Sequence, residues 1–246
     1  MTVAQVSIII PVLNEASCLG RTLRHLDILA PPAAEIIVVD GGSTDATLTI
    51  AKDYGATVVV AERSGRAVQL NLGARLAAGD ILCFLHGDTR VPDDVVALMG
   101  QTLENPNIAC GGFISVMTGT RTTRWGISLH NTIKTHYAAL LFRPHRYFQD
   151  RLRILFGDQV MFCRRGDFWA CGGFDDTLGI MEDADLCLKL SRLGHIYQIN
   201  RLVQSSDRRV ASWGALKANF IYLAIGFLWG MGVSSRWLKR FYEDVR

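Results

Sequence analysis

Short apolar runs alternate with amphipathic, helix-length segments over the first hundred residues. The runs are rich in β-branched residues and predict strands over Val6–Val12, Ile36–Val39, Thr57–Ala61 and Ile81–Leu85. The segments between and after them carry apolar residues at helical spacing and predict helices over Ser17–Leu29, Asp45–Tyr54, Ala67–Ala78 and Pro92–Glu104. This alternation predicts a mostly parallel, doubly wound α/β sheet, in which ligands bind beyond the carboxyl ends of the strands.

Charge is distributed unevenly along the 246 residues. Residues 1–104 hold 7 Lys/Arg and 12 Asp/Glu, a net charge of −5, whereas residues 105–246 hold 19 and 11, a net charge of +8. The stretch Arg121–Arg153 has seven basic residues and a single acid, Asp150. It could face anionic lipid headgroups or a phosphate-bearing substrate, or it could be a solvated face.

A second apolar feature is the charge-free segment Phe220–Val233, which has no single apolar stripe. As a helix, its fourteen residues would cover about 21 Å, short of the roughly 30 Å needed to span a bilayer. Lysine, arginine and tryptophan residues flank it, which favours peripheral membrane contact through residues 213–240. The alternatives are packing on the protein itself or in a homodimer interface.

The N-terminus lacks a basic region and a cleavage site, and Val6–Val12 is too short for a signal-sequence core. We therefore expect a cytoplasmic protein, with the inner face of the membrane as a candidate location. The six cysteines form no C-x-x-C pair, so reduced thiols are expected rather than disulfides or a zinc site.

Acidic residues follow the predicted strands and open a later helix. Asp88 lies just past a buried strand, where a carboxylate together with a diphosphate could hold Mg²⁺ or Mn²⁺. Asp40 precedes two glycines and could accept hydrogen bonds from a base or ribose, and Glu15 could bind a ligand or cap the next helix. No Gly-x-Gly-x-x-Gly follows the first strand, which disfavours NAD or FAD.

Two further segments carry candidate chemistry. Arg66 follows a flexible glycine at a predicted helix start, and both the guanidinium and the helix N-terminus suit phosphate. Glu182 and Asp183 open a later helix, where acids commonly pair with the helix dipole. After a donor site, one of them could instead take the proton of an acceptor hydroxyl.

These segments resemble family 2 glycosyltransferases of the GT-A fold, over about residues 5–210. The resemblance rests on Val6–Glu15, Ile37–Asp45, Arg66 with Asn71–Gly73, and Ala78–Asp80. It is strongest to a short bacterial subgroup with a His-Ala-Asp-Thr metal loop, here His86-Gly87-Asp88-Thr89. The implied organisation is a Rossmann-like nucleotide-sugar half (1–104), an acceptor half (105–210) and a C-terminal apolar and basic helical segment (211–246).

The resemblance also implies roles for individual residues. Nucleoside binding falls to Pro11, Glu15 and Asp40, phosphate binding to Arg66, and metal binding to Asp88. Asp183 would be the catalytic base of an inverting mechanism with Glu182 beside it, and Asp158 and Gln159 would lie near the acceptor. The departing diphosphate would meet Arg208 and Arg209. Many relatives have an acid where this chain has His86, which is either a supporting group or a loop residue.

The leading hypothesis is a metal-dependent, inverting glycosyltransferase that uses a UDP-, GDP- or dTDP-activated sugar and an acceptor hydroxyl, with a lipid as one candidate acceptor. Sugar-nucleotide nucleotidyltransferases are an alternative, but their Gly-rich, Arg-bearing first loop is missing from Pro11–Glu15. A non-catalytic nucleotide-sugar-binding protein at the membrane would not need Glu182 and Asp183. Nucleic-acid binding is disfavoured because the basic half contains no recognisable module.

Overall fold

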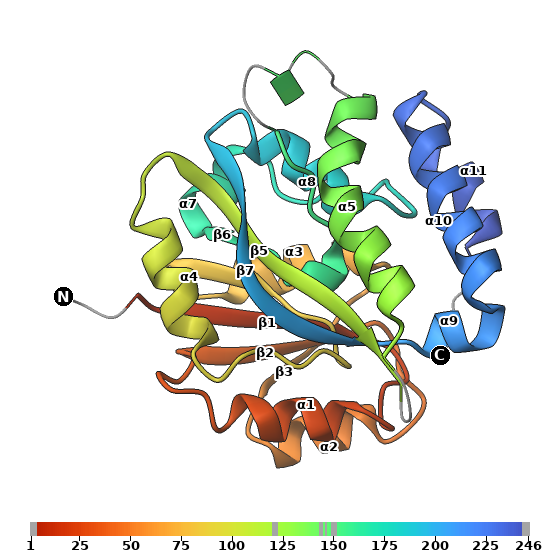
Figure 1. Cartoon of the computed structure of the whole chain (residues 1–246). Helices are drawn as coiled ribbons and strands as arrows, with labels where there is room; N and C mark the ends of the chain where they lie inside the picture. Colours follow the sequence, from red (N-terminus) through yellow and green to blue (C-terminus); the bar gives the residue numbers. More distant parts are fainter. Residues whose placement is uncertain (1–3, 120–122, 143–144, 146, 149–151, 243–246) are drawn as a thin grey trace.

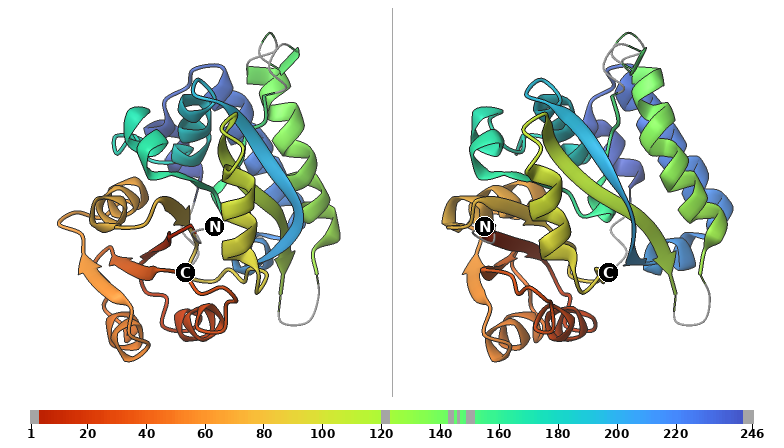
Figure 2. Two further views of the ribbon diagram at one scale, coloured as in Figure 1. Left: turned by 90° about the vertical axis from the view of Figure 1, so that its left-hand side faces the viewer. Right: turned by 60° about the vertical axis from the view of Figure 1, so that its left-hand side comes forward.

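The computed structural model describes residues 4–119, 123–142, 145, 147–148 and 152–242. Within them, seven strands form one sheet, which helices cover on both faces (Figures 1 and 2). The strands are β1 (Val6–Val12), β2 (Glu35–Asp40), β3 (Thr57–Val60), β4 (Ile81–Phe84), β5 (Ile108–Thr118), β6 (Phe162–Arg164) and β7 (His195–Ser206).

The described helices are α1 (Leu19–Leu26), α2 (Thr47–Asp53), α3 (Arg66–Leu76), α4 (Val95–Leu103), α5 (Trp125–Phe142), α7 (Arg165–Ala170), α8 (Glu182–Leu190), α9 (Arg208–Trp213), α10 (Ala215–Gly230) and α11 (Ser235–Leu238), with 3₁₀ turns η1 (Gly157–Gln159) and η2 (Lys239–Phe241). The four predicted strands and four predicted helices are confirmed, with ends that shift by a few residues. Helix α1 begins at Leu19 rather than Ser17 because a turn intervenes, in which the Glu15 carbonyl accepts the N–H groups of Cys18 and Leu19.

The order of strands is β3-β2-β1-β4-β6-β5-β7. The first four strands are mutually parallel, as predicted, and β7 is parallel to β5. The exception is β6, which is antiparallel to both β4 and β5 and joins the two halves of the sheet. One sheet therefore runs through both halves, and the carboxyl ends of β1, β2 and β4 lie at a common edge.

Both faces of the central strands are buried, which explains why their sequences are continuously apolar. Successive side chains of β1 point to opposite faces. Ile8 and Ile10 belong to one core cluster together with Met99 of α4, and Ile9 belongs to the other together with Leu70 of α3. Layers on both sides hold the strands rigidly, so the loops at their carboxyl ends have fixed starting points.

The second half adds the long strands β5 and β7 and the helices α5 and α10, which pack against each other (Figure 1). Helix α10 begins at Ala215, before the predicted Phe220, and ends at Gly230. No helix in the part of the chain that the structure describes has the length and apolar character needed to cross a membrane.

Candidate functional site

A cavity of about 770 Å³ lies at the carboxyl edge of the sheet. Loops after β1 and β4, the starts of α3, α8 and α9, and the turn η1 all contribute to its wall. Most of the ionisable residues predicted for the site line it: Glu15, Arg66, Asp88, Asp158, Glu182, Asp183 and Arg208. The topology thus brings together side chains that are up to 193 positions apart in the sequence.

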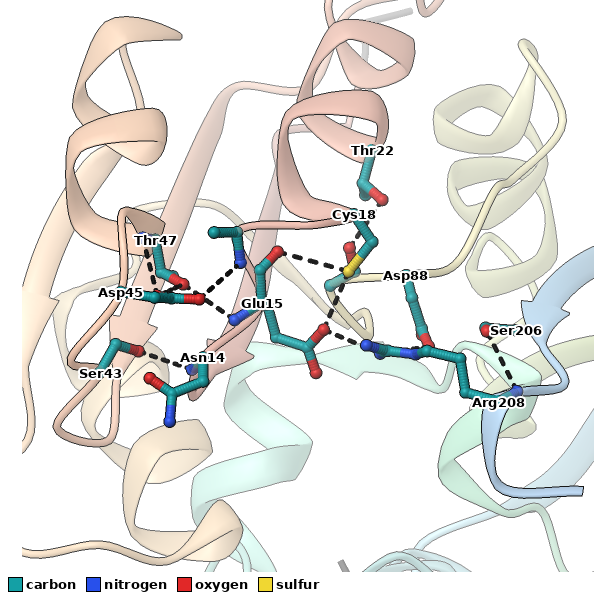
Figure 3. A network of polar contacts seen from close by, with 12 residues as sticks. Asn14, Glu15, Cys18, Thr22, Ser43, Asp45, Thr47, Asp88, Ser206 and Arg208 are labelled. Carbon is teal, nitrogen blue, oxygen red and sulfur yellow. Dashed lines mark hydrogen bonds and ion pairs between the residues drawn. The ribbon is translucent and has the colours of Figure 1, made fainter. Parts of the chain in front are cut away.

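The loop after β1 is bound to the loop after β2 by reciprocal hydrogen bonds (Figure 3). Asn14, at a positive φ of 55°, donates its N–H to the Ser43 hydroxyl, and its side-chain oxygen accepts the N–H of Thr44, both at 2.8 Å. The N–H of Glu15 is held by the hydroxyl of Thr47 at 2.8 Å. These contacts fix the backbone from which the Glu15 carboxylate extends into the cavity, and the side chain of Glu15 does not cap α1.

Asp40 shapes its own loop. Its side chain is buried, and one carboxylate oxygen accepts the N–H groups of Gly42 and Ser43 at 2.8 and 2.9 Å. The other oxygen accepts the Ser43 hydroxyl. Pro11 lines the cavity whereas Asp40 is not among its lining residues, so nucleoside contact by Asp40 stays a prediction.

Arg208, at the first position of α9, bridges the acids Glu15 and Asp88 (Figure 3). Its Nη2 lies 2.8 Å from a carboxylate oxygen of Glu15 and 2.8 Å from one of Asp88. Burial raises the pKa of Asp88, and the Arg208 guanidinium acts in the opposite direction. A cation therefore already occupies the carboxylate that the sequence predicted as a metal ligand.

A second arginine, Arg66 at the first position of α3, pairs with two acids of α8. Its Nη2 lies 3.4 Å from Asp183 and its Nη1 lies 3.5 Å from Glu182. Its Nη2 also contacts Nε2 of His86. Because a guanidinium can only donate, this ring nitrogen of His86 is the acceptor. The Nε of Arg66 is buried and has no hydrogen-bond partner among the described residues.

Glu182 and Asp183 occupy the first turn of α8, where the helix dipole favours negative charge. Both are buried, at 6% and 8% exposure, and both line the cavity. Burial, together with the neighbouring charge of Asp183, raises the pKa of Glu182 to about 7. Two adjacent, buried carboxylates form a group suited to proton transfer.

The pair Asp158 and Gln159 lies in η1, and its two members point differently. Asp158 lines the cavity. Gln159 is buried, where its amide donates to the Thr135 hydroxyl and its side-chain oxygen accepts the N–H of Phe156, both at 2.9 Å. Gln159 thereby ties η1 to α5, and its predicted contact with the acceptor stays a prediction.

Comparison with known proteins identifies the family of this chain. The family model described as Glycosyl transferase family 2 matches residues 7–170, which include the loops after β1, β2 and β4. The chain belongs to this family. A relative, the PGL/p-HBAD biosynthesis glycosyltransferase of Mycobacterium bovis, is 28% identical over 200 residues, which cover 77% of this chain and 70% of that protein. The glycosyltransferase AglE of Haloferax volcanii is 35% identical over 95 residues, which cover 35% of this chain and 31% of AglE.

Solved structures show the same architecture. A mannosyltransferase from Pyrobaculum calidifontis, in complex with GDP-Man and Mn²⁺, superposes with a TM-score of 0.66 at 18% identity, over 97% of this chain and 72% of that one. Glucosyl-3-phosphoglycerate synthase from Mycobacterium tuberculosis, in complex with Mn²⁺, UDP and glucosyl-3-phosphoglycerate, superposes with a TM-score of 0.62 at 23% identity, over 94% and 81%. The family 2 chain therefore has the GT-A fold that its sequence predicts.

Sequence reasoning missed the apolar walls of this family 2 site. They include Met117 at the end of β5, Tyr137 of α5, Phe156 before η1, and Phe220 and Phe227 of α10. No local pattern distinguishes the first three from ordinary core residues. The apolar run in α10 was visible, but it was assigned to a membrane, to the protein itself or to a dimer interface and not to the wall of the cavity. The side chain of Arg209, the other predicted diphosphate ligand, lies outside the described residues.

Proposed function

We propose that this protein transfers a sugar, with inversion at the anomeric carbon, from a nucleoside-diphosphate sugar to an acceptor hydroxyl. Membership of family 2 supports sugar transfer over nucleotidyl transfer or ligand sensing. The observation that carries the proposal is the shared cavity, which has Asp88 and Arg208 in one part and Asp183 with Glu182 in another. The first pair suits a diphosphate with its metal, and the second suits removal of a proton.

The donor end offers the carboxylate of Asp88 as a ligand for Mg²⁺ or Mn²⁺. Among the described residues, no cluster of three or more His, Cys, Asp or Glu side chains could hold an ion, so the donor diphosphate would have to supply ligands beside Asp88. When bound, the cation would neutralise the charge that develops on the leaving diphosphate. Arg66 lines the cavity, and its guanidinium is suited to donate hydrogen bonds to a phosphate oxygen.

Proton removal falls to Asp183. The acceptor oxygen attacks the anomeric carbon, its proton passes to the Asp183 carboxylate, and the bond from that carbon to the phosphate oxygen breaks, with the electron pair leaving on the nucleoside diphosphate. Arg66 holds Asp183 in place through its Nη2, 3.4 Å away. Protonation of Glu182 near neutral pH relieves the repulsion between the two carboxylates.

The acceptor end is apolar, and this supports a lipid as the molecule that carries the hydroxyl. Tyr137, Phe156, Phe220 and Phe227 line the cavity together with the acids of α8. Such walls are suited to an acyl or prenyl chain or to an aromatic group.

The test begins with a panel of UDP-, GDP- and dTDP-sugars with Mn²⁺, measured by release of nucleoside diphosphate. Asp183→Asn should lower kcat by at least about a hundredfold while donor binding is retained, because only the proton acceptor is lost. Asp88→Asn should weaken Mn²⁺-dependent donor binding itself. Asp185→Asn is the matched control, since Asp185 lies on the same helix but pairs with Lys189 at 2.7 Å. Near-normal turnover by Asp183→Asn would remove Asp183 as the base.

A further inference from the structure

Two neighbouring helices expose apolar stripes on the surface. Helix α10 is held to the protein by one face, on which Ala218 and Ile225 are buried. Its opposite face carries an apolar residue at every third or fourth position. These residues are 47 to 89% exposed: Leu216, Phe220, Leu223, Phe227 and Met231. Helix α5, which packs beside it, exposes Trp125, Leu129, Ile133 and Leu140 at a similar spacing.

These stripes differ from the isolated apolar residues found on any protein surface. Regular spacing places each set along one side of its helix, and the two helices are neighbours in all the views (Figures 1 and 2). The sequence of α10 is apolar on all sides. One of its faces packs on the protein, and the described part of the chain leaves the opposite face uncovered. A partner with an apolar interior would cover it.

Basic residues near the α10 stripe favour an anionic partner. From the start of α10 to residue 242, the sequence has four basic residues and no acid. Lys217, Arg236 and Arg240 are exposed close to the α10 stripe in sequence. Two copies of this surface would bring like charges together, whereas anionic lipid headgroups would complement them. Exposed Trp125 and Trp237 also suit the boundary between lipid and water.

We propose that the exposed faces of α5 and α10 together form a docking surface for an anionic lipid bilayer. The sixteen residues of α10 would lie along the bilayer surface, with the apolar stripe in the acyl-chain boundary and the basic residues among the headgroups. The stripe is continuous with the cavity, because Phe220, Leu223 and Phe227 are exposed and also line it. Docking would therefore open the acceptor end of the cavity towards the membrane, a consequence that rests on the proposed function.

The experiment is co-sedimentation with vesicles of phosphatidylcholine alone and with about 30% phosphatidylglycerol, at low and high salt. The wild type should bind the anionic vesicles, and salt should weaken this binding. The double substitution Leu129→Glu with Leu216→Glu replaces two exposed stripe residues that do not line the cavity. It should weaken binding about tenfold or more, since each change removes apolar contact and adds repulsion. Ile28→Glu is the matched control, because Ile28 is 61% exposed and lies in the nucleotide half.

A second variant, Lys217→Glu with Arg240→Glu, tests the charges without touching the apolar stripe, and thermal unfolding monitors the fold of every variant. Equal vesicle binding by the wild type and both double variants, or failure of the wild type to bind anionic vesicles, would overturn the docking surface. If the wild type is a dimer and the double substitution Leu129→Glu with Leu216→Glu dissociates it, the proposal is also overturned. The stripes would then form an interface with a second copy of the chain. Mn²⁺-dependent binding of nucleoside diphosphates, measured without vesicles, tests the proposed function separately.

Discussion

The pair of buried acids at the start of α8 should make the protein less stable as the pH rises through neutrality. Glu182 is only 6% exposed and lies beside Asp183, with the nearest positive charge, Nη1 of Arg66, 3.5 Å away. Burial and the repulsion from Asp183 raise the pKa of Glu182 from 4.5 to about 7. Replacing Glu182 by Gln keeps the shape of the protonated side chain and removes the charge.

The size and sign of the effect follow from proton linkage. Because the folded-state pKa lies above the unfolded value, the folded protein holds this proton more tightly, and its contribution to stability is fully present below pH 4.5. That contribution is lost as the pH rises through about 7. One pKa unit corresponds to about 1.36 kcal/mol, so the shift amounts to about 3 kcal/mol of lost stability above pH 7. Glu182→Gln should therefore be close to wild type near pH 4.5 and more stable by up to about 3 kcal/mol at pH 8.

Urea unfolding of both proteins at pH 5 and pH 8 measures this difference, since the other titrating groups are common to both. Glu62→Gln, at an exposed position, is the control and should differ from wild type by the same amount at both pH values. A Glu182→Gln variant that is less stable than wild type at pH 8, or whose difference from wild type does not change with pH, would refute the linkage argument.

Three further substitutions probe the site and its support. Gly157→Ala should fold but lose most turnover, measured as kcat, because the new Cβ would lie 2.0 Å from Nη2 of Arg66 and 2.5 Å from an oxygen of Asp183. Arg208→Gln should bind Mn²⁺ roughly tenfold more tightly without nucleotide, measured by calorimetry, because a competing charge-assisted hydrogen bond to Asp88 is lost; weaker Mn²⁺ binding would contradict this. Gln69→Leu should lower the free energy of unfolding by about 2 kcal/mol in urea titrations, since its buried amide donates to backbone carbonyls at the ends of both β1 and β2.

Local pattern was sufficient for the elements of residues 1–104 and for the edge at which their loops meet. The strands β1, β2 and β4 are largely buried runs, and those of β1 alternate between two cores, whereas β3 at the edge of the sheet is partly exposed. Parallel strands necessarily place their carboxyl ends together. The acids that follow or open these elements, such as Asp88, are therefore predictable as residues of one cavity. The same reasoning treated Asp158 and Gln159 alike, whereas Asp158 lines the cavity and the Gln159 side chain is buried and bonded to Thr135.

The amino-acid sequence by itself determined the α/β class, the family and most of the charged residues that line the cavity, because these depend on periodicity and on short motifs. Only the tertiary structure decided that β6 runs antiparallel between β4 and β5, and that Arg208 reaches Asp88 across 120 positions. It also decided which face of α10 stays exposed. Such contacts depend on how distant elements pack against each other, and an apolar residue has the same local signature whether it faces a core, a cavity or the surface.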